Sequence, residues 1–394
     1  MTRPEELLSD VLRERVEHYE APSTPMRDVV STARRVRRRR RVRTGVATAA
    51  AVAVVAAPFV VAASRSTDSS SERPGPAQEE AQPLRLADVA AGPPPGTAWL
   101  DGRDYVAGDG SRTTLPFDDV VRAAPYRGTL LLVRGDGHVV WLDRDLDGGT
   151  RWCGRGSLAV SPDGATTAFA VSPDAPDCPG EGVVTLHVGP AGPTSAAADQ
   201  TRAMPPQDTA LVGFLGNSVV ASPYNEGPPV LLGPDGTSTT IEQLAHVTGV
   251  SARLGLVSGQ LAGSGAEPPT GVVLDPVTGS TSWTKPGWQL RDFSPDGSMV
   301  LGVRPAAVGA PLTWGAFDAS SGEQLHEFAT PAGFTFSQVV WEDDDHLLMD
   351  TVQGSSEALV RASLGGELQL ATEASSSDGD PAGVRYRLAP NAAW

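Results

Sequence analysis

Three aspartates stand at alternate positions before a turn glycine, a pattern in which carboxylates can converge on one hard cation. They are Asp143, Asp145 and Asp147. Calcium loops place oxygen donors in this way at their first, third and fifth positions. The ninth and twelfth positions, where further oxygen donors are usual, are here Arg151 and Gly154. The segment therefore predicts either a calcium site or the solvated tip of a β-hairpin.

The chain has two cysteines, Cys153 and Cys178. In an oxidising compartment such a pair most simply forms a disulfide, which would stabilise the fold by about 3 kcal/mol through closure of the loop between them. Two separate thiols are the alternative. No histidine lies close to either cysteine in the sequence, so a metal site built on them is not expected.

No paired nucleophile and base, metal-ligand spacing or phosphate-binding loop occurs in the sequence. The acidic run Glu342–Asp345 is interpreted as an exposed turn. Most tryptophans fall in strand patterns and are expected to pack in the core, but Trp288 and Trp341 lie near the predicted inner strands and are the first candidates for contact with a ligand. We therefore expect no enzyme, no cofactor other than a possible calcium ion, and a binding protein.

The charge is divided unevenly along the chain. The net charge of −16 argues against general binding to nucleic acid. Residues 1–43 carry 12 Arg and 7 acidic residues, and eight of the ten residues 34–43 are Arg. The remainder of the chain is strongly acidic, which suits a soluble domain and says little about its partner.

A stretch of 21 uncharged residues, 44–64, follows the arginine cluster. As a helix it would span about 30 Å, the thickness of the hydrocarbon core of a bilayer. The positive-inside rule keeps the arginine side in the cytoplasm, so the sequence predicts a single-pass cell-membrane protein whose C-terminal part is extracytoplasmic. Signal-peptidase cleavage after Ala63 and a buried soluble helix are the alternatives. Residues 65–83, rich in Ser and Pro, are interpreted as a disordered linker.

The cytoplasmic segment, residues 1–43, has an apolar stripe at helical spacing that includes Leu8 and Leu12. Such a stripe requires a partner. It could be anionic membrane lipid, helped by the arginines, or a cytoplasmic regulator such as a sigma factor bound through residues 1–33.

From residue 84 to residue 394 the sequence alternates short apolar runs with turns, and one unit repeats. Each unit is a strand, a turn with glycine, and a second strand. The successive turn glycines are 38, 44, 44, 43, 43 and 44 residues apart, at Gly110, Gly148, Gly192, Gly236, Gly279, Gly322 and Gly366. A period in the low forties predicts an all-β, seven-bladed β-propeller. Six or eight blades, or a double β-sandwich, are the alternatives.

A second motif, Ser-Pro-Asp-Gly, lies midway between these turns at residues 161–164 and 294–297. It resembles the blades of TolB-like and WD-repeat-like propellers, in which this motif joins the innermost strand to the next strand. The layout of a cytoplasmic segment, one membrane helix and an outer propeller also resembles membrane proteins of actinobacteria, some of them similar to partners of sigma factors. A composition with 30 Arg and one Lys agrees with such a GC-rich source.

The resemblance implies a fold and leaves the activity open. We predict a binding or sensing module that recognises a protein or a cell-envelope ligand. A regulator of a cytoplasmic protein and an enzyme acting on cell-wall polymers are the alternatives. Residues 384–388 are expected to add a strand that closes the ring, in a blade that the sequence does not specify.

Overall fold

The computed structural model describes residues 84–143, 151–152, 154–171, 185–189, 202–203, 209–223, 227–263, 268–306, 310–376 and 385–389, all within one compact unit, Glu79–Trp394. The expected N-terminal helical segment, the membrane helix and the linker, residues 1–83, lie outside the described residues. Among the described residues, no helix is long and apolar enough to cross a bilayer.

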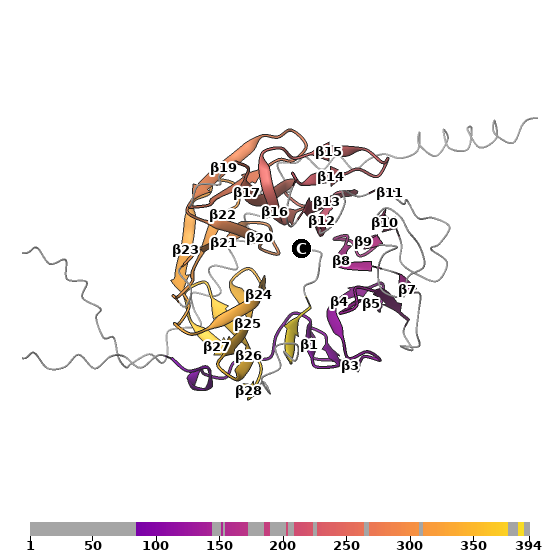
Figure 1. The fold of residues 1–394 in the computed structure, drawn as a ribbon. Helices are drawn as coiled ribbons and strands as arrows, with labels where there is room; N and C mark the ends of the chain where they lie inside the picture. Colours follow the sequence, from indigo (N-terminus) through magenta and orange to yellow (C-terminus); the bar gives the residue numbers. More distant parts are fainter. Residues whose placement is uncertain are drawn as a thin grey trace, which may run out of the picture. The chain divides into compact units, whose positions relative to one another are not determined.

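The described strands form seven antiparallel sheets around a common centre, with a short 3-10 helix, η1 (Leu86–Asp88), before them (Figure 1). The chain is thus an all-β, seven-bladed propeller. The prediction of seven blades is confirmed, and the alternatives of six blades, eight blades and a double sandwich are wrong. We number the blades in chain order and give their strands from the innermost outward.

The first four blades are as follows. Blade 1 contains β29 (Tyr386–Leu388), β1 (Trp99–Asp101), β2 (Asp104–Val106) and β3 (Arg112–Thr114). Blade 2 contains β4 (Val120–Tyr126), β5 (Thr129–Arg134), β6 (Val139–Leu142) and β7 (Arg151–Trp152). Blade 3 contains β8 (Gly154–Val160), β9 (Thr167–Val171), β10 (Thr185–Gly189) and β11 (Arg202–Ala203). Blade 4 contains β12 (Thr209–Leu215), β13 (Ser218–Pro223), β14 (Val230–Leu232) and β15 (Ser238–Thr240).

The other three blades complete the ring. Blade 5 contains β16 (Leu244–Ser251), β17 (Leu256–Leu261), β18 (Thr270–Leu274) and β19 (Thr281–Pro286). Blade 6 contains β20 (Gln289–Phe293), β21 (Met299–Arg304), β22 (Thr313–Asp318) and β23 (Gln324–Ala329). Blade 7 contains β24 (Thr335–Trp341), β25 (His346–Gln353), β26 (Ser356–Ser363) and β27 (Leu368–Leu370), and β28 (Ser375–Ser376) also pairs with β26.

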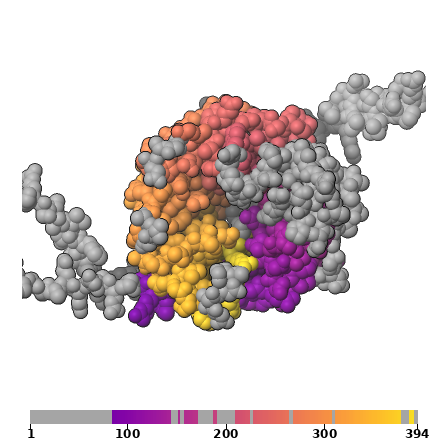
Figure 2. Space-filling view, in the orientation of Figure 1, coloured from indigo at the N-terminus to yellow at the C-terminus, as the bar shows by residue number. Residues whose placement is uncertain are grey.

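Blade 1 is closed by the C-terminal strand. Leu100 of β1 pairs with Arg387 of β29, so the last strand of the chain becomes the innermost strand of the first blade. Figure 2 shows the yellow C-terminal residues against the indigo and magenta residues of the first blades. The predicted closing strand is therefore confirmed, and the structure assigns it to blade 1.

The repeated turns have the backbone conformation that their sequence predicts. The glycine of the outer hairpin has a φ between 71° and 88° in the five blades where it is described, at Gly110, Gly236, Gly279, Gly322 and Gly366. This left-handed region carries no steric penalty for glycine alone. Gly148 and Gly192 lie outside the described residues.

The two Ser-Pro-Asp-Gly turns join β8 to β9 and β20 to β21, as expected for the link from the innermost strand to the next. Both turns are held by the same pattern of hydrogen bonds. In the second turn the Ser294 hydroxyl donates to Asp296 Oδ1 at 2.9 Å and accepts from the Met299 amide at 3.0 Å. In both turns the Ser and Asp side chains therefore bond to each other and to the local backbone.

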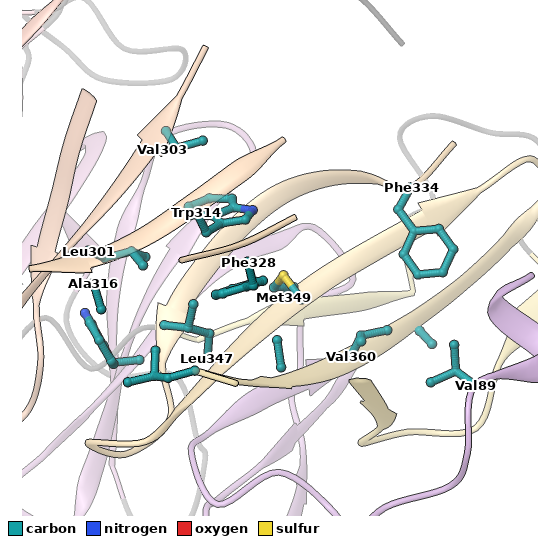
Figure 3. Packing of buried hydrophobic residues seen from close by; sticks show 14 of the residues in the cluster. Val89, Leu301, Val303, Trp314, Ala316, Phe328, Phe334, Leu347, Met349 and Val360 are labelled. Carbon is teal, nitrogen blue, oxygen red and sulfur yellow. The ribbon is translucent and has the colours of Figure 1, made fainter. Parts of the chain in front are cut away.

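The core lies between neighbouring sheets. Figure 3 shows Leu301, Trp314 and Ala316 of blade 6 facing Leu347, Met349 and Val360 of blade 7. All six are buried. Burial of these apolar faces between blades is the main source of the propeller's stability.

Candidate binding site at the inner strand of blade 6

The innermost strands from β4 to β24 are interrupted by β-bulges. Each of these six strands shifts register against its neighbour: β4, β8, β12, β16, β20 and β24. A bulge leaves its backbone groups without the usual ladder partners and redirects its side chains. The inner wall of the propeller is therefore the place where this fold can present unusual polar groups.

The bulge in β20 exposes two adjacent charged residues, Arg291 and Asp292. Leu290 pairs with Gly302 and Phe293 pairs with Val300, so Arg291 and Asp292 together oppose a single residue of β21. Leu290 and Phe293 are buried, whereas Arg291 and Asp292 are exposed on the innermost strand.

Three successive carbonyls of the β20 bulge accept hydrogen bonds from side chains of the two neighbouring blades. From blade 5, the Thr248 hydroxyl donates to the carbonyl of Leu290 at 2.7 Å and the Ser258 hydroxyl donates to that of Arg291 at 2.6 Å. From blade 7, the Trp341 indole N–H donates to the carbonyl of Asp292 at 3.1 Å. These bonds replace the missing ladder and fix the bulge in one conformation.

Gly249 of β16 lets blade 5 approach this bulge closely. A Cβ at Gly249 would lie 2.7 Å from Cα of Asp292 and 2.8 Å from the carbonyl oxygen of Arg291. No real side chain tolerates such contacts, so the bulge can sit where it does only because residue 249 has no side chain.

The carboxyl group of Asp292 has an unusual protonation equilibrium. Burial by the surrounding blades raises its pKa to about 7, although backbone hydrogen bonds from Phe293 and Val250 act in the opposite direction. Part of the residue is exposed to solvent, but the surrounding protein removes much of the hydration that a carboxylate has in bulk solvent. Asp292 can thus change charge near neutral pH.

Arg291 lines a pocket between blades 6 and 7 with a volume of about 210 Å³. Its walls are mostly apolar, and Gln289 and Ser337 add polar groups; the other lining residues are Val303, Pro305, Leu312, Trp314, Phe336 and Val339. Figure 3 shows Val303 and Trp314 at one end of the core between the two blades. Burial lowers the pKa of the Arg291 guanidinium.

A second, wider pocket of about 600 Å³ lies beside the first Ser-Pro-Asp-Gly turn. Its one charged wall residue, Asp163, accepts from the Ser161 hydroxyl at 2.5 Å, and both side chains bond to the backbone of the same turn. Because these side chains already serve the turn, the pocket beside Arg291 is the better candidate for recognition of a charged ligand.

The two tryptophans predicted to contact a ligand are buried supports of β20. Trp288 is 3% exposed and its ring lies over Gly302 and Gly315, where an added Cβ would come within 3.4 Å and 2.8 Å of the indole. Trp341 is 2% exposed and bonds to the bulge. Ligand contact by either ring stays a prediction, and the structure gives both rings a packing role.

The remaining predicted site residues are described only in part. Asp143 is half-buried just after β6, whereas Asp145 and Asp147 lie outside the described residues, so the calcium site stays a prediction. Cys153 and Cys178 also lie outside them, and so does the predicted disulfide. Within the described ranges, no group of three or more His, Cys, Asp and Glu side chains is arranged to hold a metal ion.

The interpretation of Glu342–Asp345 as an exposed turn needs one correction. Asp343, Asp344 and Asp345 are exposed, but the Glu342 side chain is only 4% exposed and forms an ion pair with Arg361 at 2.5 Å. Arg361 also donates to the carbonyls of Pro93 and Pro94, so Glu342 helps to hold the segment before β1 against blade 7.

Arg291 and Asp292 were not singled out from the sequence. The available signal was the segment Gln-Leu-Arg-Asp-Phe directly before the second Ser-Pro-Asp-Gly turn, because two adjacent charges break the alternation of a half-buried strand. Such a break is what a bulge produces.

Comparisons with known proteins found distant structural matches only. No family model matches the chain, and no curated protein matches its sequence. Among solved structures, the β-propeller domain of Cps50 (Swd1) from Myceliophteria thermophila is 12% identical, covers 67% of this chain and 88% of that one, and has a TM-score of 0.47. BamB from Moraxella catarrhalis is 12% identical, with coverages of 71% and 84% and a TM-score of 0.38.

An acylaminoacyl peptidase from Pyrococcus horikoshii is 13% identical, with a TM-score of 0.48; the match covers 68% of this chain and 47% of the peptidase. At these identities and TM-scores the matches say nothing about the activity of this chain.

Proposed function

We propose that this chain is a non-enzymatic binding or sensing module, a seven-bladed propeller held at the outer face of the cell membrane by residues 44–64. The observation that carries the binding role is the bulge of β20. It presents Arg291 and Asp292 side by side on a backbone fixed from both neighbouring blades. Charged groups held rigidly at an exposed inner wall are typical of recognition sites, because little ordering entropy is lost on binding.

The sequence supports the anchored topology. Eight arginines among residues 34–43 precede 21 uncharged residues, which favours a cytoplasmic N-terminus and an extracytoplasmic propeller. Protease added to intact protoplasts should then remove the propeller and spare the N-terminal segment. Loss of the N-terminal segment with an intact propeller would contradict this topology.

The binding role has its own test. The full chain, purified in detergent, is mixed with fractionated cell-envelope components, and retention is compared between the wild type and an Arg291→Gln/Asp292→Asn double variant. We expect a retained component that is recovered chemically unchanged and that the double variant retains less. Cleavage or modification of the component would indicate an enzyme, and equal retention by both proteins would exclude the β20 bulge as the binding site.

A further inference from the structure

We propose that the pocket between blades 6 and 7 binds a small monocarboxylate with an apolar body, whose carboxylate pairs with Arg291. This inference rests on the proposed binding function and names the chemical class of ligand. It is carried by three features of the same pocket: a cation that pairs with no carboxylate of the described residues, a buried hydrogen-bond donor for which those residues provide no acceptor, and apolar walls.

The first feature is the state of Arg291. No carboxylate of the described residues lies within ion-pair distance of its guanidinium, and none of the hydrogen bonds of the described residues uses it. Other arginines of blades 6 and 7 are paired: Arg304 lies 3.7 Å from Glu327, and Arg361 contacts Glu342. An anionic ligand that reaches this guanidinium would supply a counter-charge and a bidentate hydrogen bond.

The second feature is Trp314, whose side chain lines the pocket. Its indole N–H is buried and has no hydrogen-bond acceptor among the residues that the structure describes. A buried donor without an acceptor costs about 1–3 kcal/mol, and native proteins rarely keep one unless a water, ion or ligand satisfies it. A carboxylate has more lone pairs than Arg291 alone can use, so it can also accept from Trp314 after a small adjustment of the wall.

The third feature is the chemistry and size of the remaining walls. Val303 and Trp314 belong to the buried core between blades 6 and 7, and Leu312, Phe336 and Val339 pack against that core. A pocket of about 210 Å³ is smaller than the roughly 300 Å³ at which sites for drug-sized ligands begin. The occupant is therefore a small molecule that is apolar apart from one anionic group.

A single cation among apolar walls favours a monocarboxylate over inorganic phosphate. Phosphate carries more charge and more acceptor oxygens, and its usual sites provide several backbone or side-chain donors. Phosphate binding is therefore a distinct and contrary outcome of the test.

The experiment uses the full chain in detergent, with binding followed by ligand-observed NMR. The probes are phenylacetate, the isosteric neutral phenylacetamide and inorganic phosphate. For the wild type we expect saturable binding of phenylacetate and at least tenfold weaker binding of phenylacetamide. Arg291→Gln should weaken phenylacetate binding about tenfold and remove the preference for the acid, because only the charge interaction is lost.

The matched control is Arg304→Gln in the next strand of the same blade. Arg304 does not line the pocket and lies over the ring of Trp288 at 4.5 Å. Its loss should leave the affinity for phenylacetate unchanged. Leu312→Trp keeps Arg291 and fills the pocket, so it should abolish binding of both phenylacetate and phenylacetamide. If Arg291→Gln does not fold, this variant tests whether the probes bind in the pocket.

Equal affinity for the acid and the amide, unchanged binding in Arg291→Gln, or competition by phosphate at equal strength would overturn the monocarboxylate assignment. Failure of all three probes to bind the wild type would overturn it as well. None of these results decides the proposed function, which is judged by retention of an envelope component on the full chain.

Discussion

The indole N–H of Trp341 donates a hydrogen bond to the backbone carbonyl of Asp292 at 3.1 Å, and this bond joins the end of the inner strand of blade 7 to the bulge of blade 6. Trp341 is also part of the core between these two blades. The Trp341 side chain therefore links the packing between the blades to the backbone conformation of Asp292. Asp292 is the residue whose pKa is raised to about 7.

Trp341→Phe should lower the free energy of unfolding by roughly 2 kcal/mol, because one buried hydrogen bond and part of a buried ring are lost. The measurement is urea unfolding of the full chain. Trp283→Phe is the matched control, since Trp283 donates a comparable bond to the carbonyl of Ala319 at 2.9 Å. Both variants should lose similar stability, but only Trp341→Phe should alter the titration of Asp292. An equal effect of both variants on that titration would contradict the coupling.

Gly249→Ala should destabilise the propeller by about 1–3 kcal/mol, because the new Cβ would lie 2.7 Å from Cα of Asp292 and must displace the bulge. Thermal or urea unfolding measures the loss. Gly365→Ala is the control, since its Cβ would meet only the Ser363 hydroxyl at 3.6 Å. A Gly249→Ala variant as stable as the Gly365→Ala variant would show that the blades adjust without strain.

The Ser-Pro-Asp-Gly turns and the turn glycines could be predicted from the sequence because both are local signals. Each depends on the φ that one or two residues can adopt, and the chain repeats them at a constant period. The number of blades followed from that period. The closing strand was also recognisable, but its place in blade 1 was not, because nothing local distinguishes the edge of one blade from that of another.

The candidate site could not be predicted, because it depends on contacts between blades. The bulge of β20 exists where Gly249, Thr248 and Ser258 of blade 5 meet the backbone of blade 6. None of these residues has an unusual sequence context. The packing roles of Trp288 and Trp341 could not be predicted for the same reason, since the burial of both rings and the bond from Trp341 to the bulge depend on how the blades meet.

The stability of the protein should depend on pH through Asp292. Its pKa is about 7 in the folded chain, above the ordinary value of 3.8 that applies when the chain is unfolded. Between these values the folded state binds more protons than the unfolded state, so this group lowers the free energy of unfolding as the pH rises from about 4 to about 7. Below pH 4 and above pH 7 its contribution is constant.

Asp292→Asn removes this contribution. The difference in unfolding free energy between the wild type and Asp292→Asn, measured by urea titration at several pH values, should therefore shift against the wild type as the pH rises from 4 to 7. Asp163 provides a control with the opposite sign, because hydrogen bonds from Ser161 and Ala165 lower its pKa. A pH-independent difference for Asp292→Asn would show that Asp292 titrates normally.

The buried pair of Glu342 and Arg361 makes the strongest prediction for stability. Glu342 accepts from Arg361 at 2.5 and 2.6 Å and from the Gly96 amide at 2.5 Å, and both side chains of the pair are less than a tenth exposed. Glu342→Gln leaves the guanidinium buried without a counter-charge, so it should cost roughly 3–5 kcal/mol in urea unfolding. Asp343→Asn, on the exposed neighbour, should cost less than about 1 kcal/mol.

The Glu342→Leu/Arg361→Met double variant distinguishes two effects. One is the cost of an uncompensated buried charge, and the other is the loss of hydrogen bonds to the segment before β1. Removing both charges avoids an uncompensated ion, so the double variant should be more stable than Glu342→Gln alone. Recovery should be partial, because the carbonyls of Pro93 and Pro94 and the Gly96 amide lose their side-chain partners. If the double variant were less stable than Glu342→Gln, the main role of Arg361 would be its bonds to the segment before β1 and not its pairing with Glu342.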